Sequence, residues 1–164
     1  MAFQIAIARQ GGVLVHSSSV RFGSHAVVAV GQSTAGKSTL AGLCREAGGQ
    51  LLSDEMTALF PDGTVYGTPF RSSDPTPGHP GPAKLGLLVL LDKAPHEALT
   101  PLAPEKALPR ILEQVYRGYD RGELTPGKIL ERVAGAMNVC PPQLLSFRKH
   151  PDAGHFVRQA LERL

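Results

Sequence analysis

A glycine-rich segment in the first third of the chain has the residue types and spacing that bind phosphate groups: Gly31-Gln32-Ser33-Thr34-Ala35-Gly36-Lys37-Ser38-Thr39. It fits the P-loop pattern G-x-x-x-x-G-K-[ST], in which small residues let backbone N–H groups converge on phosphate oxygens. Lys37 has the charge and length to reach the outer phosphates, and the Ser38 hydroxyl is a ligand for Mg²⁺. The predicted nucleotide-binding residues are Gly31, Ser33, Thr34, Ala35, Gly36, Lys37, Ser38 and Thr39.

The residues that flank this loop favour the phosphate-binding interpretation over a glycine-rich turn that contains a lysine by chance. An apolar run, Ala26 to Val30, precedes the loop and predicts a strand, and a helix-forming segment, Leu40 to Ala47, follows it. The positive end of a helix that begins at Lys37 adds to the attraction for phosphate. The pair Gly48-Gly49 predicts the end of this helix.

Two adjacent carboxylates, Asp54 and Glu55, follow the short apolar segment Gln50 to Ser53. One helix and one return strand separate them from Lys37, so we expect both acids to lie beside the bound phosphates. Neighbouring residues at a strand end point in different directions. One acid can therefore face a metal ion while the other takes the proton of an attacking hydroxyl. An exposed acidic turn is the alternative.

His16 and Arg71 are candidates from outside the loop. His16 lies in the predicted strand Val13 to Val20, which forms a hairpin with the strand before the loop and can bring His16 near Asp54 or the phosphates. Arg71 has the charge to stabilise a transferred phosphoryl group. Each residue also has an interpretation without a function: His16 as a histidine at the edge of a sheet, and Arg71 as a solvated arginine in a polar loop. The other five histidines share no metal-ligand spacing.

The elements around these residues predict an α/β fold. Alternation over Phe3 to Ala8 indicates a strand, and the hairpin over residues 13–30 places antiparallel strands before the loop, so the sheet is expected to be mixed. Met56 to Phe60 and Thr64 to Gly67 predict a second hairpin. Lys84 to Leu91 is the most apolar strand candidate and is expected at the centre of the sheet.

A proline-rich loop and a mainly helical C-terminal third complete the chain. Pro69 to Pro82 cannot form a regular element and predicts a mobile loop on the substrate side. Helical periodicity covers Pro104 to Tyr119, a segment that begins at Pro126 with Thr125 as N-cap, and the residues after Asp152. The last two helices are predicted to bury Leu130 and Leu164, and residues 143–147 predict a short strand.

Length and composition favour one folded domain over residues 1–164. The hydrophobic content of 42% and charged content of 19% are ordinary for a globular protein. The net charge of +3 is small, and its basic residues are interspersed with acids, which argues against a nucleic-acid partner. We expect a cytoplasmic protein that does not bind membranes, because the sequence has no leader and no apolar run of about 18 residues. Two cysteines form neither a disulfide framework nor a metal-binding spacing.

The order of these motifs resembles the catalytic domain of HPr kinase/phosphorylase and the smaller HPr-kinase-like kinases of bacterial gene clusters, some of which modify peptides. That family shares a nucleotide-binding core with phosphoenolpyruvate carboxykinases. The resemblance covers most of residues 11–92 and is carried by the hairpin ending in His16, the loop Gly31 to Thr39, Leu51-Leu52-Ser53-Asp54-Glu55, Gly67-Thr68-Pro69-Phe70 and the later apolar strand. It implies a mixed-sheet P-loop domain of this type.

The resemblance also implies roles for the candidate residues. Lys37 binds phosphate, Ser38 and Glu55 hold Mg²⁺, Asp54 is the base for a serine hydroxyl, and His16 belongs to the active site. If residues 69–72 replace the family's Glu-Ile-Arg-Gly segment, Arg71 is retained and Pro69 stands in place of the glutamate. That difference argues against HPr as the substrate and against the reverse phosphorylase reaction. The resemblance suggests self-association, although no segment identifies an interface.

The leading functional prediction is a kinase that uses Mg²⁺ and ATP, or GTP, and transfers the terminal phosphate to a hydroxyl. The expected acceptor is a serine of a protein or peptide. Two other hypotheses remain open. One is a nucleotide-sensing interaction module that phosphorylates nothing, and the other is a kinase for a small molecule such as free serine.

Overall fold

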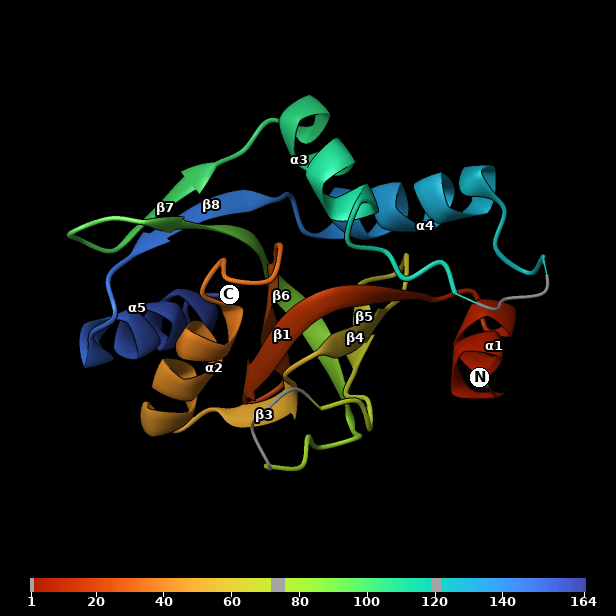
Figure 1. Cartoon of the computed structure of the whole chain (residues 1–164). Helices are drawn as coiled ribbons and strands as arrows, with labels where there is room; N and C mark the ends of the chain where they lie inside the picture. The colour runs from red at the N-terminus through yellow and green to blue at the C-terminus, as the bar shows by residue number, and fades with distance from the viewer. Residues whose placement is uncertain (1, 72–75, 119–121) are drawn as a thin grey trace.

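The computed structural model describes residues 2–71, 76–118 and 122–164, and in these ranges one eight-stranded mixed sheet packs against five helices (Figure 1). The strands are β1 (Val13–Phe22), β2 (His25–Val30), β3 (Gln50–Ser53), β4 (Met56–Leu59), β5 (Thr64–Tyr66), β6 (Pro82–Lys93), β7 (Ala98–Pro101) and β8 (Gln143–Phe147). The helices are α1 (Ala2–Arg9), α2 (Lys37–Glu46), α3 (Pro104–Leu112), α4 (Pro126–Val139) and α5 (Pro151–Glu162).

Helices cover both faces of the sheet. Helices α2 and α5 lie over one face, and α3 and α4 lie over the other (Figure 1). Strand β2 supplies both cores, because Val27 and Ala29 face α2 and α5 while Val28 and Val30 face α3 and α4. This double burial explains why the strand before the phosphate loop is an uninterrupted apolar run. Cys44 and Cys140 are both free, in agreement with the prediction that they form no disulfide framework, and both are buried.

The strand pairings place three parallel strand ends at one edge. Strand β2 pairs antiparallel with β1 and parallel with β6, and β6 pairs parallel with β8. In register, Val30 of β2 lies opposite Leu90, and Lys93 lies opposite Phe147. Strands β4 and β5 connect β1 back to β6, so β1, β2, β6, β5 and β4 form a closed circuit of pairings. The predicted mixed sheet, both hairpins and the central position of β6 are confirmed.

The strand predicted over Phe3 to Ala8 is wrong, since these residues belong to α1. Ile7 packs with Leu14 of β1 and Ala58 of β4, and these two strands are already paired with each other. The guanidinium of Arg132 donates hydrogen bonds at 2.9 Å to the carbonyl oxygens of Ala8 and Gly12, which satisfies the end of the helix. A short apolar run fits a helix or a strand equally well, and here tertiary contacts decide for the helix.

The helix predicted over Pro104 to Tyr119 is shorter than expected. Helix α3 ends at Leu112, and the chain then runs beside β1, where Val115 bridges Val15 and the Tyr116 N–H donates to the Leu14 carbonyl at 2.8 Å. Strand β2 pairs only with residues 17–22 of β1. The same edge of β1 is open over residues 13–16, and residues 114–116 pair with it there. Tyr119 lies outside the described residues.

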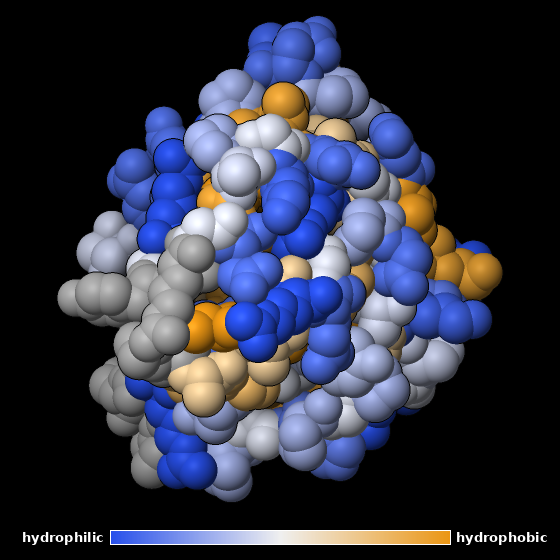
Figure 2. All heavy atoms as spheres, turned by 90° about the vertical axis from the view of Figure 1, so that its right-hand side faces the viewer, coloured by the Kyte–Doolittle hydropathy of each residue, from blue (hydrophilic) through white to orange (hydrophobic). Residues whose placement is uncertain are grey.

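The remaining helical predictions are largely confirmed. Thr125 caps α4 by accepting a hydrogen bond from the Lys128 N–H, and β8 forms over the expected residues. Leu130 and Leu164 are not buried, with 45% and 68% of their surfaces exposed. Figure 2 shows the side of the molecule on the right of Figure 1, where hydrophilic side chains predominate and hydrophobic ones form small patches. No described helix has the length and apolar character needed to cross a membrane.

The proline-rich loop has no strand or helix over its described residues 69–71 and 76–81, as predicted, and β6 begins at Pro82. Residues 72–75 lie outside the description. The His79 N–H donates to the Leu51 carbonyl at 2.8 Å, so this part of the loop is attached to β3.

We expect Gly154→Ala to destabilise the protein, because a Cβ at this position of α5 would lie 2.0 Å from the Leu43 carbonyl oxygen of α2. Forcing the two helices apart should lower the free energy of unfolding by about 1–3 kcal/mol, measured by denaturant titration with circular dichroism. Gly42→Ala, in α2 with no heavy atom within 4 Å of its added Cβ, is the control and should raise stability by up to about 1 kcal/mol. Equal effects of the two substitutions would contradict the close packing of α2 and α5.

Candidate functional site

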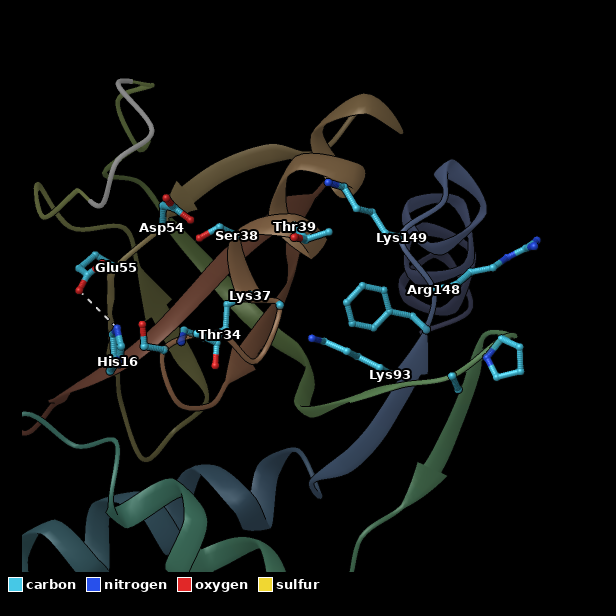
Figure 3. A pocket seen from close by; sticks show the side chains of 15 residues that line it. His16, Thr34, Lys37, Ser38, Thr39, Asp54, Glu55, Lys93, Arg148 and Lys149 are labelled. Carbon is cyan, nitrogen blue, oxygen red and sulfur yellow. Dashed lines mark ion pairs between the residues drawn. The ribbon is translucent and has the colours of Figure 1, made fainter.

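A pocket of about 890 Å³ lies at the edge of the sheet where the parallel strands β2, β6 and β8 end (Figure 3). Ligands of open α/β sheets bind at this edge, beyond the carboxyl ends of the strands. The predicted residues Ser33, Thr34, Gly36, Lys37, Ser38 and Thr39 line the pocket together with His16, Asp54 and Glu55. Gly31 and Ala35 line a smaller pocket of about 310 Å³ beside the same loop. The fold thus brings most of the predicted site residues together.

The phosphate loop adopts two left-handed backbone conformations. Gly36 has φ of 102° and directly precedes α2, and Thr34 has φ of 78°. Positive φ is costly for a β-branched residue such as threonine, and such strain is concentrated at functional sites. Gly36 also lies close to β8, because a Cβ there would lie 3.3 Å from Cζ of Phe147. The ring of Phe147 on β8 thus lies beside the loop.

Lys37 is almost fully buried, with 7% of its surface exposed. Its ammonium donates hydrogen bonds at 2.7 Å to the carbonyl oxygens of Gly31 and Gln32, so it binds the start of its own loop. Burial lowers the pKa of Lys37, while the nearby charges of Glu55 and Asp54 raise it. Lys37 is thus held within the field of both carboxylates.

The acids lie in a short interruption between β3 and β4. Both strands pair with the same edge of β1, with Ser53 opposite Ser19 and Met56 opposite His16. The Ser53 hydroxyl donates to the Met56 carbonyl and accepts the Met56 N–H at 3.2 Å. Thr68 donates to the same carbonyl at 2.5 Å. These bonds fix the turn that presents Asp54 and Glu55 to the pocket.

His16 lies within β1 and contacts the acid turn directly. Its Nε2 is 3.3 Å from Oε1 of Glu55 (Figure 3). The sequence predicted His16 near Asp54 or the phosphates, and the structure places it in the same pocket. Asp54 is 7% exposed. Arg71 is exposed and is not among the residues that line this pocket.

The opposite side of the pocket could not be recognised from the sequence alone. This side is lined by Lys93, Ala94 and Pro95 at the end of β6 and by Phe147, Arg148 and Lys149 at the end of β8. Part of the signal was present, because both strands were predicted and polar residues that follow parallel strands gather at one edge. What the sequence did not show is that β8 is parallel to β6.

The charge and donor set of the pocket suit a magnesium-bound polyphosphate. Four cationic side chains and two carboxylates line it, so it carries an excess of positive charge. The described residues contain no group of three or more His, Cys, Asp or Glu able to enclose a metal ion. The hydroxyl of Ser38 and the carboxylates of Asp54 and Glu55 fit Mg²⁺, which binds through one or two carboxylates plus substrate phosphates.

No protein-family model matches this chain, and no curated protein matches its sequence. Function is therefore inferred from the geometry of the pocket.

We expect Ser53→Ala to loosen the acid turn. Ser53 is buried, and its hydroxyl contacts the backbone of Met56 and Glu55 and the hydroxyl of Thr68. Loss of this bonding should lower the free energy of unfolding by about 1–3 kcal/mol. Ser24→Ala, at the exposed turn of the β1–β2 hairpin, is the control and should change stability by less than about 0.5 kcal/mol. Thermal and denaturant unfolding measure both, and a Ser53→Ala protein as stable as the control would contradict the role of Ser53.

Proposed function

We propose that this protein is a kinase that transfers the terminal phosphate of ATP, or of GTP, to a hydroxyl group, with a serine of a protein or peptide as the acceptor. The observation that carries this proposal is the acid pair, Asp54 and Glu55, on the same pocket as the phosphate loop. A phosphate loop alone supports nucleotide binding. A carboxylate across the pocket from that loop adds a group able to accept the proton of an attacking hydroxyl.

The loop and its lysine bind the nucleotide in this proposal. The N-terminus of α2 and the loop backbone attract the phosphates, and Lys37 exchanges its hydrogen bonds with the Gly31 and Gln32 carbonyls for bonds to phosphate oxygens. Ser38 and Glu55 hold Mg²⁺, which when bound offsets the negative charge of the phosphates. The contact with His16 fixes the direction of the Glu55 carboxylate.

Asp54 is the proposed base. The acceptor oxygen bonds to the terminal phosphorus, the bond from that phosphorus to the nucleoside diphosphate breaks, and the hydroxyl proton passes to Asp54. Burial of Asp54 and its fixed turn restrict the direction of its carboxylate, which suits proton transfer at a defined position. Serine as the acceptor is supported by the motif order shared with the HPr-kinase-like kinases.

Lys37→Ala should abolish Mg-ATP binding, because it removes the one lysine buried within the loop. Titration calorimetry with Mg-ATP measures this, and Lys106→Ala, at an exposed position of α3, is the control that should bind like the unmodified protein. Unchanged affinity of the Lys37→Ala protein would refute the loop as the nucleotide site.

Asp54→Asn should bind Mg-ATP within about threefold of the unmodified protein but transfer phosphate at least about 100-fold more slowly, since general-base catalysis typically contributes 10²–10⁴-fold. Transfer is followed with γ-labelled ATP and a lysate of the source cells, or with free serine. Equal transfer by the variant would refute the base assignment. Binding without transfer to any protein, peptide or free serine would instead favour a nucleotide-sensing module.

A further inference from the structure

Two chain segments form the side of the pocket opposite the acids: Lys93–Pro95 at the end of β6 and Phe147–Lys149 at the end of β8, here called the β6/β8 segments. Lys93 pairs with Phe147 in the sheet, and the Ala94 N–H donates to the Phe147 carbonyl at 3.1 Å, so the two segments form one continuous surface. In Figure 3 the phosphate loop lies between this surface and the acid pair.

Two cations of the β6/β8 segments are free to bind an anion. The side chains of Lys93 and Lys149 extend toward the phosphate loop and α2 (Figure 3). Neither ammonium has a hydrogen bond or an ion pair with any other residue that the structure describes. Arg148 differs, because it points away from the loop and contacts Glu97 at 3.5 Å and Asp152 at 2.9 Å.

The acids determine which way a nucleotide lies in this pocket. If Asp54 is the base, the terminal phosphate must face Asp54, and a triphosphate bound along the loop extends its α-phosphate in the opposite direction. Thr39, on the first turn of α2, and the β6/β8 segments lie on that side. The partly buried Ala94 and the exposed Pro95 add apolar surface to the lining of the pocket.

We propose that the β6/β8 segments bind the nucleoside end of the nucleotide, with Lys93 and Lys149 contacting its α-phosphate and Ala94–Pro95 contacting the base. This assignment rests on the proposed kinase function, because Asp54 as the base sets the direction in which the nucleotide lies. It makes Lys93 and Lys149 binding residues for any nucleotide that carries an α-phosphate, including the product diphosphate.

Titration calorimetry with Mg-ADP and Mg-ATP tests the two lysines. Lys93→Met and Lys149→Met should each raise Kd about tenfold, as expected for a charged hydrogen bond, and by similar factors for both nucleotides. Lys84→Met removes a lysine at the opposite, exposed end of β6 and should leave both Kd values within about twofold of the unmodified protein. Unchanged affinity in both test variants, or weakening of ATP without weakening of ADP, would overturn the assignment.

Photolabelling with 8-azido-ATP and peptide mapping tests the base contact independently. The expected label lies on residues 93–95 or 147–149, and label confined to peptides that contain His16 or Asp54 would overturn the direction. If ATP binding requires Lys37 but neither Lys93 nor Lys149, only this inference fails and the proposed kinase function stands. No binding of either nucleotide by the unmodified protein would refute both.

Discussion

A hydrogen bond from the buried hydroxyl of Ser18 to the Lys37 carbonyl, at 3.0 Å, joins the central strand of the site to the first turn of α2. Strand β1 pairs with β2 on one edge and with β3 and β4 on the other. The phosphate loop and the acid turn are therefore attached to opposite edges of one strand, over its polar stretch Ser17 to Ser19. Their separation is set by the backbone pairing of the sheet, and the chemistry proposed here depends on that spacing.

The site carries features that oppose stability. Lys37 and Asp54 are each only 7% exposed, and burying a charge is costly unless hydrogen bonds and opposite charges compensate. Lys37 is compensated by two loop carbonyls and by the acids. Thr34 holds a backbone conformation that β-branched residues avoid. These costs gather at one pocket while both cores are apolar, and backbone strain and buried charge gathered in this way are typical of functional sites.

Those parts of the molecule that depend on local signals were predictable from the sequence. The phosphate loop, the hairpin before it and the cap at Thr125 follow from nearby residues, and the acids were expected beside Lys37 because the connection is short. Where tertiary contacts decide, prediction failed. Residues 3–8 form a helix because Leu14 and Arg132 provide its contacts, and Val115 leaves the helical pattern because β1 has an open edge. The positions of Lys93 and Lys149 at the pocket could be predicted only from the order of the strands in the sheet.

Gly36 and Phe147 lie side by side in the fold but far apart in the chain, so they come together late in synthesis. The ribosome synthesises the whole phosphate-loop motif long before it synthesises β8. Chains acquire structure from the N-terminal side during synthesis. Parallel pairing of β6 with β8 needs the intervening helices α3 and α4 to be present, and such distant pairings form slowly. A nascent chain therefore holds the complete motif while it still lacks the aromatic ring that lies beside Gly36, and the loop reaches its final packing only when translation is nearly finished.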